Sequence, residues 1–283
     1  MDRMTSISDS NRNLAAYFNR IGYGGAAGAS AAVLADVHWH HVSSIPFENL
    51  DVILGRKVDL DPAAIAAKLI GARRGGYCFE QNGLYLAMLQ QLGFKAEALA
   101  ARVWWGRTDP SLPPRTHMTL RVGIGDDAYL CDVGFGGMTP VSPLRWVLDL
   151  TQPTTHETYR LREMRDGPAA GETLLEAEID GGWQRLYSFL PQPVPLPDFN
   201  LANWYVSTHP ASFFTQAMIV AMPFGEGRHV LQDRKSTRRA RDRSEAVRLL
   251  GDRRDLGAQL EEIFGLTLTS GDLDRLWGRL ATL

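Results

Sequence analysis

A cysteine follows a double glycine and two arginines in residues 73–82, which read Arg-Arg-Gly-Gly-Tyr-Cys-Phe-Glu-Gln-Asn. A helical pattern begins just after them, because apolar residues recur at the spacing of one helix face, at 84, 85, 88, 89 and 92, until Gly93 supplies a stop. Cys78 is therefore expected at a helix N-terminus, where unpaired backbone N–H groups and the helix dipole favour a thiolate over a thiol. Gly75 and Gly76 would let another backbone or a substrate come close. This stretch alone is equally compatible with a reactive cysteine and with a buried structural one beside a tight turn.

Composition describes an ordinary globular protein. The 283 residues suffice for two or three packed units, and 45% hydrophobic and 22% charged residues are usual values. A net charge of -2 gives no reason to expect nucleic acid or a membrane as a partner. Residues 1–13 lack the apolar core of a signal peptide, and no apolar run approaches a membrane span. The only cysteines are Cys78 and Cys131, which argues against a disulfide framework and favours a reducing compartment. We therefore expect a cytoplasmic protein.

The residue patterns divide the chain into three parts, expected at 1–93, 94–196 and 197–283. The first part is mostly helical, with helices expected at 14–21, 31–42, 61–70 and 78–92, and Pro46 interrupts the pattern between the second and third. The middle part has short strand-like runs at 96–105, 117–124, 128–133, 157–164, 173–179 and 183–189. Closely spaced strands without intervening helices predict an antiparallel barrel or sandwich. Four prolines within residues 191–197 indicate a stiff linker at its end.

The last part mixes helices and strands. Helical character is expected in part of 198–214, strands at 218–222 and 229–231, and two closing helices at 256–264 and 273–280, with Ser270 as the cap of the second. A basic run at 234–243 is typical of a solvated loop, although it could also help to hold phosphates. No aromatic residue interrupts this run, which argues against a groove for nucleic acid.

A nucleophilic cysteine needs a base, and that base needs an orienting group. The histidines available for this role are His38, His40, His41, His117, His156, His209 and His229. Three of them cluster at 38–41 on a predicted helix, but no cysteine or carboxylate stands beside them at the spacing of metal ligands. Packed or surface histidines are favoured there over a zinc site, and no metal is expected.

His117 stands at the start of a predicted strand, and the next strand ends at Asp132. A hairpin centred near residue 125 would place Asp132 across from His117, where its carboxylate could accept the imidazole N–H and fix the tautomer. Alone, Asp132 is equally typical of a turn before glycine. Together with Cys78, the pair predicts a Cys-His-Asp triad. Papain-like proteases share this order, but their histidine lies much further downstream of the cysteine.

Several segments closely resemble the arylamine N-acetyltransferase family. They are IPFENL at 45–50, RGGYCFEQN at 74–82, ARV at 101–103, THM at 116–118, DVGFGG at 132–137 and STHPASFF at 207–214. The resemblance spans nearly the whole chain in the same order. It implies an α+β fold in which a helical bundle, an antiparallel β-barrel and a C-terminal α/β lid surround a cysteine-protease-like Cys-His-Asp core.

The resemblance also implies an activity. Cys78 would accept the acetyl group of acetyl-CoA and pass it to an arylamine or arylhydrazine in a ping-pong reaction, as in xenobiotic metabolism, with His117 as base and Asp132 as its orienting carboxylate. The acceptor pocket would be lined by Phe47, Val103, Phe135 and Phe213. The residues expected to accommodate CoA are Thr116, Gly134, Gly136 and Thr215.

Two other classes share these residues. A cysteine hydrolase or transglutaminase-like enzyme would use the same triad on other acyl groups, and a non-catalytic binding protein would leave Cys78 unreactive. Within the opening stretch, we also expect Arg74 and Glu80 to form a buried pair that braces the helix start.

Overall fold

The N-terminal part of the molecule is helical. The structure is a computed structural model, and it describes residues 13–109 and 111–280. Residues 13–21 are helical, and α2 (Ala31–Ser44), α3 (Leu50–Ile53), α4 (Pro62–Ala66) and α5 (Cys78–Gln91) follow. The side chain of Ser30 caps α2, and that of Asp61 accepts the Ala63 N–H at 2.8 Å to cap α4. The helix expected at 61–70 changes hydrogen-bonding pattern at Ala67, where the π-helical turn η1 (Ala67–Gly71) replaces the α-helix.

The middle part is a nearly closed antiparallel barrel of eight strands in the order β5-β4-β3-β2-β9-β8-β7-β6. The strands are β2 (Lys95–Val103), β3 (Arg115–Ile124), β4 (Asp127–Cys131), β5 (Leu144–Arg145), β6 (Gln152–Pro153), β7 (Thr158–Glu163), β8 (Thr173–Ile179) and β9 (Gly182–Phe189). The two edge strands approach each other: the Gln152 amide donates to the Arg145 carbonyl at 3.0 Å and accepts the Arg145 N–H at 2.7 Å. Buried side chains such as Leu99, Tyr159 and Phe189 fill the interior.

The six predicted strands of this part are confirmed as β2, β3, β4, β7, β8 and β9. The sequence did not predict β5 and β6, because a strand of two residues has no alternation to detect.

The C-terminal part contains a five-stranded sheet in the order β1-β10-β11-β12-β13. Its elements are η3 (Leu196–Asp198), α6 (Phe199–Thr208), α7 (Phe213–Gln216), β10 (Ile219–Phe224), β11 (Gly227–Gln232), β12 (Lys235–Ala240), β13 (Glu245–Leu249), α8 (Arg253–Ala258), η4 (Gln259–Ile263) and α9 (Ser270–Leu280). The first strand, β1 (Phe47–Glu48), comes from the N-terminal part and pairs with β10, Phe47 opposite Ala221. The segment after Pro46 thus leaves the helices to join this sheet.

Two expectations for this part are wrong. The basic run is not a loop, because most of it forms β12, which pairs with β11 and β13. Serine, threonine and alanine separate its cations, so the backbone pairs on both sides while arginine side chains reach the surface. The second closing helix begins at Ser270, but its cap is Thr269, whose hydroxyl accepts the Asp272 N–H at 3.2 Å.

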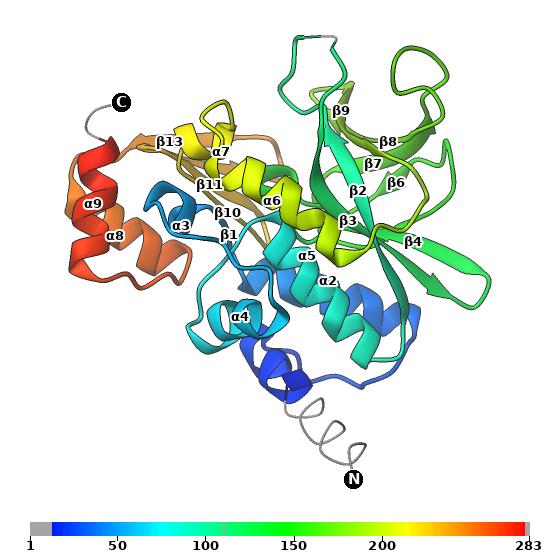
Figure 1. The fold of residues 1–283 in the computed structure, drawn as a ribbon, viewed down its shortest axis with the longest axis horizontal. Coiled ribbons are helices and arrows are strands. Elements are labelled where there is room, and N and C mark those ends of the chain that lie inside the picture. Colours follow the sequence, from blue (N-terminus) through cyan, green and yellow to red (C-terminus); the bar gives the residue numbers. More distant parts are fainter. Residues whose placement is uncertain (1–12, 110, 281–283) are drawn as a thin grey trace.

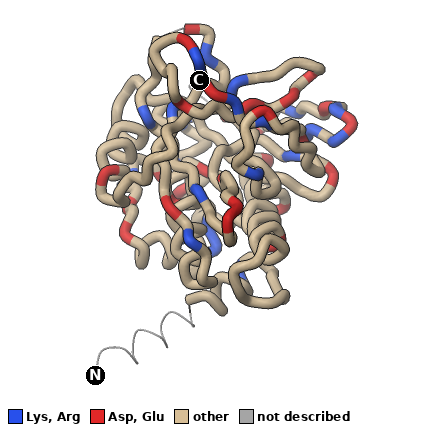
Figure 2. The backbone as a smooth tube through the Cα atoms, turned by 90° about the vertical axis from the view of Figure 1, so that its right-hand side faces the viewer, with Lys and Arg blue, Asp and Glu red and all other residues tan. Residues whose placement is uncertain are grey.

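The fold is α+β, with a helical bundle, an antiparallel barrel and a C-terminal sheet with its helices. Figure 1 shows α5 in the middle of the molecule, between the barrel strands and the C-terminal sheet, which α8 and α9 follow in the chain. Figure 2 shows basic and acidic residues interleaved along the chain. The boundaries expected at 93/94 and 196/197 stay a prediction. Within the described residues, no helix has both the length and the apolar character needed to cross a membrane.

Candidate active site

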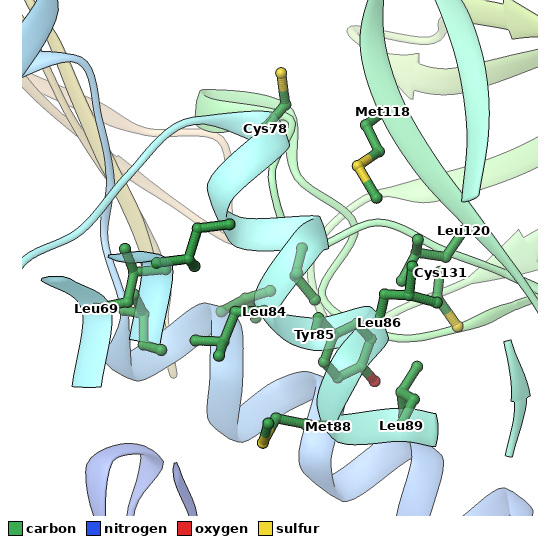
Figure 3. Packing of buried hydrophobic residues seen from close by; sticks show 14 of the residues in the cluster. Leu69, Cys78, Leu84, Tyr85, Leu86, Met88, Leu89, Met118, Leu120 and Cys131 are labelled. Atoms are coloured by element: carbon green, nitrogen blue, oxygen red, sulfur yellow. The ribbon is translucent and has the colours of Figure 1, made fainter. Parts of the chain in front are cut away.

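Cys78 is the first residue of α5 and is 3% exposed. Its sulfur points away from the apolar side chains of the same helix, which pack beneath it against the other helices and the barrel (Figure 3). The helix start is fixed by Glu80, whose carboxylate accepts the Tyr77 N–H at 3.1 Å. The predicted place of Cys78, at a helix N-terminus, is confirmed.

The double glycine before the cysteine permits a close backbone approach, as the sequence predicts. A Cβ atom at Gly75 would lie 2.1 Å from the carbonyl oxygen of Pro46, and one at Gly76 would lie 2.7 Å from the Glu80 carboxylate. The Glu48 N–H donates to the Gly76 carbonyl at 3.0 Å. The segment around β1 is therefore held directly against the turn that leads into α5.

The expected pairing of Arg74 with Glu80 is wrong. Arg74 donates to the Glu48 carboxylate at 2.6 Å and lies 3.4 Å from Asp51. Glu80 instead lies 2.7 Å from the ammonium group of Lys68. Arg74 and Glu80 do form buried ion pairs, but the partner of each lies on another element, Glu48 on β1 and Lys68 on η1.

His117 and Asp132 lie together in the buried end of the barrel hairpin. The imidazole Nε2 is 2.6 Å from a carboxylate oxygen of Asp132, and the residues are 3% and 0% exposed. The strand register pairs Leu120 with Cys131, which places Asp132 level with Thr119. The two side chains therefore meet diagonally on one face of the hairpin, and not directly opposite each other as the centred turn predicted.

His117 and Asp132 each stabilise the ionised form of the other. Burial opposes an ionised Asp132, but the imidazole of His117 and hydrogen bonds hold the pKa of that carboxyl below its usual range. Burial likewise opposes a charged His117. The Asp132 charge and hydrogen bond, with smaller contributions from Cys78, overcome this and raise the pKa of His117 to about 10. His117 is accordingly an imidazolium at neutral pH.

The cysteine completes the arrangement. Because Nε2 of His117 faces Asp132, Nδ1 is the nitrogen left for another partner, and a hydrogen bond and charge from Cys78 contribute to the raised pKa of His117. The Cys78 sulfur also lies 3.9 Å from the carbonyl oxygen of Thr116. The structure thus brings Cys78, His117 and Asp132 together from α5, β3 and the end of β4.

Asn82 ties these elements to one another. Its amide donates to the Met118 carbonyl at 2.7 Å and to Asp132 at 3.0 Å, and its oxygen accepts the Val133 N–H at 3.1 Å. Asn82 was not predicted from the sequence as part of the site. Its position one helical turn after Cys78, on the same face, is the signal that could have found it.

The residues expected to line an acceptor pocket fall into two aromatic groups. The Phe135 ring centre lies 5.1 Å from that of His117 and 5.0 Å from that of Tyr187, and Val103 pairs with Tyr187 across the strands. Phe47 and Phe213 each lie 5.9 Å from Phe214. Phe47 is buried, whereas Phe213 is 51% exposed. Tyr187 and Phe214 were not predicted, since nothing in the local pattern distinguishes them from core residues.

The residues expected to accommodate CoA have structural roles as well. A Cβ at Gly134 would lie 2.9 Å from the Cα of Cys78, so this glycine lets the strand end reach the helix. Gly136 has a positive φ of 73° and faces the Phe47 ring. The hydroxyl of Thr215 donates to carbonyls of its own turn, at 2.8 Å for Ser212. Thr116 lies beside the Cys78 sulfur through its backbone.

The clustered histidines have ordinary structural partners. His38 bonds to the Pro140 carbonyl at 2.9 Å, and His41 bonds to Gln81 at 2.8 Å and to Tyr17 at 2.8 Å. Burial lowers the pKa of His38 to about 4 and that of His41 to about 3. Both are packed neutral side chains, as expected.

A buried cysteine at a helix start, beside an imidazolium held by a carboxylate, is the arrangement of enzymes that transfer acyl groups through a thiol. A family model described as N-acetyltransferase matches residues 30–273. A relative from Mycobacterium tuberculosis, an arylamine N-acetyltransferase, is 44% identical over 261 residues, which is 90% of each chain.

Solved structures agree with this. The arylamine N-acetyltransferase structure from M. tuberculosis has a TM-score of 0.88 at 41% identity, covering 93% of this chain and 99% of that one. The Mycobacterium marinum enzyme in complex with CoA has a TM-score of 0.88 at 37% identity, covering 95% and 98%. The chain belongs to the arylamine N-acetyltransferase family and is an acyltransferase.

Proposed function

We propose that this enzyme moves the acetyl group of acetyl-CoA to the nitrogen of an arylamine or arylhydrazine through an acetyl-cysteine at Cys78, in a ping-pong reaction. The observation that carries the proposal is the buried His117, held as an imidazolium by Asp132 and facing Cys78. An imidazolium at this place stabilises a thiolate, which is the nucleophilic form of cysteine. The relative solved with CoA and the relatives named for arylamines support the two substrates.

In the first half-reaction, the Cys78 sulfur attacks the thioester carbonyl and a new C–S bond forms. The tetrahedral intermediate then collapses, the bond to the CoA sulfur breaks, and the imidazolium of His117 gives its proton to the leaving thiolate. Backbone N–H groups at the start of α5 carry partial positive charge, and that of Cys78 is our candidate donor to the oxyanion.

In the second half-reaction, the amine nitrogen attacks the acetyl-cysteine and an amide forms. His117, now neutral, accepts the proton of the amine, and the Cys78 thiolate leaves. The thiolate and imidazolium are thereby restored. Asp132 keeps the imidazole in one tautomer and stabilises its charged form throughout.

The same proposal assigns the substrate contacts. Phe47, Val103, Phe135 and Phe213 would hold the aromatic ring of the acceptor, and the clustering of aromatic rings around His117 and Phe214 supports this. Thr116, Gly134, Gly136 and Thr215 would lie along CoA. We also propose that the enzyme acts on foreign aromatic amines. We further propose that it is cytoplasmic, since two free, buried cysteines are in keeping with a reducing compartment.

The test is single-turnover labelling. Incubation with acetyl-CoA alone should release one CoA per enzyme and place one acetyl group on Cys78, and a later addition of an arylamine should remove it as the amide. Cys78→Ala should fold and release no CoA. Loss of the acetyl group to water at the same rate with and without amine would favour a hydrolase and overturn the proposal.

A further inference from the structure

A buried ionic cluster lies beside the turn that precedes Cys78. The ammonium group of Lys68 is 2.7 Å from one carboxylate oxygen of Glu80 and 2.7 Å from Asp51. The Lys68 side chain is 18% exposed, that of Glu80 only 3%. A buried carboxylate of this kind persists in its ionised form only when a cation and hydrogen bonds compensate it.

The π-helical turn η1 holds Lys68 in place. Its Ala72 N–H donates five residues back, to Ala67 at 2.8 Å, and this widens the turn from which Lys68 projects. The Lys68 carbonyl accepts the Arg74 N–H at 3.1 Å. Lys68 is therefore anchored at both its backbone and its ammonium group to the segment that leads into α5.

Glu80 connects this cation to the catalytic helix. While Oε1 faces Lys68, Oε2 accepts the Tyr77 N–H at 3.1 Å, in the peptide unit that joins Gly76 to Tyr77, the residue before Cys78. The carboxylate also rests on Gly76, where even a Cβ would come within 2.7 Å of it. The position of the Tyr77 peptide, and so of Cys78, depends on where this carboxylate sits and on its charge.

We infer that Lys68 is a positioning residue for Cys78: it holds the Glu80 carboxylate in place, so that Glu80 can fix the Gly76–Tyr77 peptide that leads to the nucleophile. The inference rests on the proposed role of Cys78 as the acetyl acceptor. It adds a residue whose ammonium group pairs with Asp51 and Glu80 and acts on the nucleophile through Glu80.

The charges around Glu80 define how Lys68 acts. Two charged groups act on Glu80 directly: Lys68 from η1 and Glu48 from β1. Asp51 and Arg74 complete the cluster by pairing with these two groups. Burial raises the pKa of Glu80, Lys68 opposes this, and Glu48 adds to it, which leaves the pKa at about 7. Without Lys68 the pKa of Glu80 rises further, and the carboxyl is neutral at neutral pH. A hydrogen bond to a neutral acceptor is roughly half as strong as one to a carboxylate.

The experiment measures how fast iodoacetamide alkylates Cys78, followed by mass spectrometry of its peptide between about pH 5 and 9. In the wild-type enzyme, the rate should rise as Glu80 ionises, with a midpoint near pH 7. Lys68→Met should move this midpoint upward by at least about one pH unit and slow alkylation at least about fivefold at pH 7. Lys57→Met, which removes a cation that is 83% exposed, is the matched control and should change nothing.

Three further variants separate a positioning role from an effect on stability alone. Glu80→Gln keeps an oxygen for the Tyr77 N–H but cannot titrate, so its rate should show no step near pH 7. In the K68M/E80Q double variant, the loss of Lys68 should no longer slow alkylation. Lys68→Arg keeps the charge and should restore the wild-type midpoint.

The inference is overturned if K68M keeps the wild-type pH profile and only melts earlier, or if K68M slows alkylation equally with and without E80Q. Should K68M not fold, a wild-type step in E80Q would overturn it as well. The proposed function is tested separately, because failure of acetyl-CoA to label wild-type Cys78 leaves these alkylation profiles interpretable.

Discussion

Replacing Asp132 with asparagine removes the charge that keeps His117 protonated while it preserves the shape of the side chain. His38 and His41 are not hydrogen-bonded to a carboxylate, and burial lowers their pKa values to about 4 and about 3, although the charge of Asp132 partly offsets this for His38. His117 is equally buried, so its pKa should fall from about 10 toward that range in the variant. With a pKa of about 4, roughly one His117 in a thousand is charged at neutral pH, since each pH unit above the pKa reduces the charged fraction tenfold.

If the thiolate of Cys78 depends on this imidazolium, Asp132→Asn should slow alkylation of Cys78 by up to about a thousandfold at neutral pH, and acetyl transfer with it. The assay is the rate of iodoacetamide labelling at Cys78, read by peptide mass spectrometry beside a thermal melt. Asp272→Asn is the control, because Asp272 is also buried and ion-paired, to Arg56 at 2.6 Å, but lies on α9. A folded D132N variant that reacts within a few-fold of wild type would refute the electrostatic account of the site.

Further predictions concern the residues that hold the site together. Asn82→Ala should lower the free energy of unfolding by about 3 kcal/mol in urea titrations, because it leaves buried backbone partners unpaired; a loss below about 1 kcal/mol would contradict this. Gly134→Ala should slow acetylation by acetyl-CoA at least about tenfold, since the added Cβ would lie 2.9 Å from the Cα of Cys78; Gly123→Ala, whose Cβ would have 3.7 Å of room, should not. The raised pKa of His117 means that its contribution to stability is complete below about pH 6.5 and is lost as pH rises through about 10; urea midpoints that stay flat from neutral pH to about 10.5 would contradict it.

The sequence predicted the placement of Cys78 well, for a local reason. A helix start is set by neighbouring residues, here two glycines that allow a close approach and an apolar period that begins soon after. The strands of the barrel were also predictable where they are long enough to alternate. That Cys78, His117 and Asp132 lie together could be predicted once a hairpin joined His117 to Asp132.

The remaining features depend on contacts between distant segments. The true register of the hairpin moves Asp132 level with Thr119, and no residue near the turn reveals this shift. Arg74 and Glu80 are close in sequence, yet Glu48 and Lys68 are their partners because η1 and β1 pack against the turn. Asn82 shares a helix face with Cys78, but its partners on the barrel hairpin are known only when that hairpin is placed against α5.

The basic run shows how composition can mislead. Its charges suggested a solvated loop, but a strand at the surface can carry arginines and still pair its backbone on both sides. What decides between the two is whether neighbouring strands are available, and β11 and β13 provide them here.

One measurement tests the central claim most directly. The enzyme is mixed with acetyl-CoA in the absence of amine, digested, and examined by mass spectrometry for acetylation at each peptide, with CoA release followed in parallel. We predict one acetyl group on the peptide that contains Cys78, released CoA in equal amount, and loss of both signals in Cys78→Ala. CoA release without a modified Cys78, or acetylation at Cys131 or elsewhere in its place, would contradict the account.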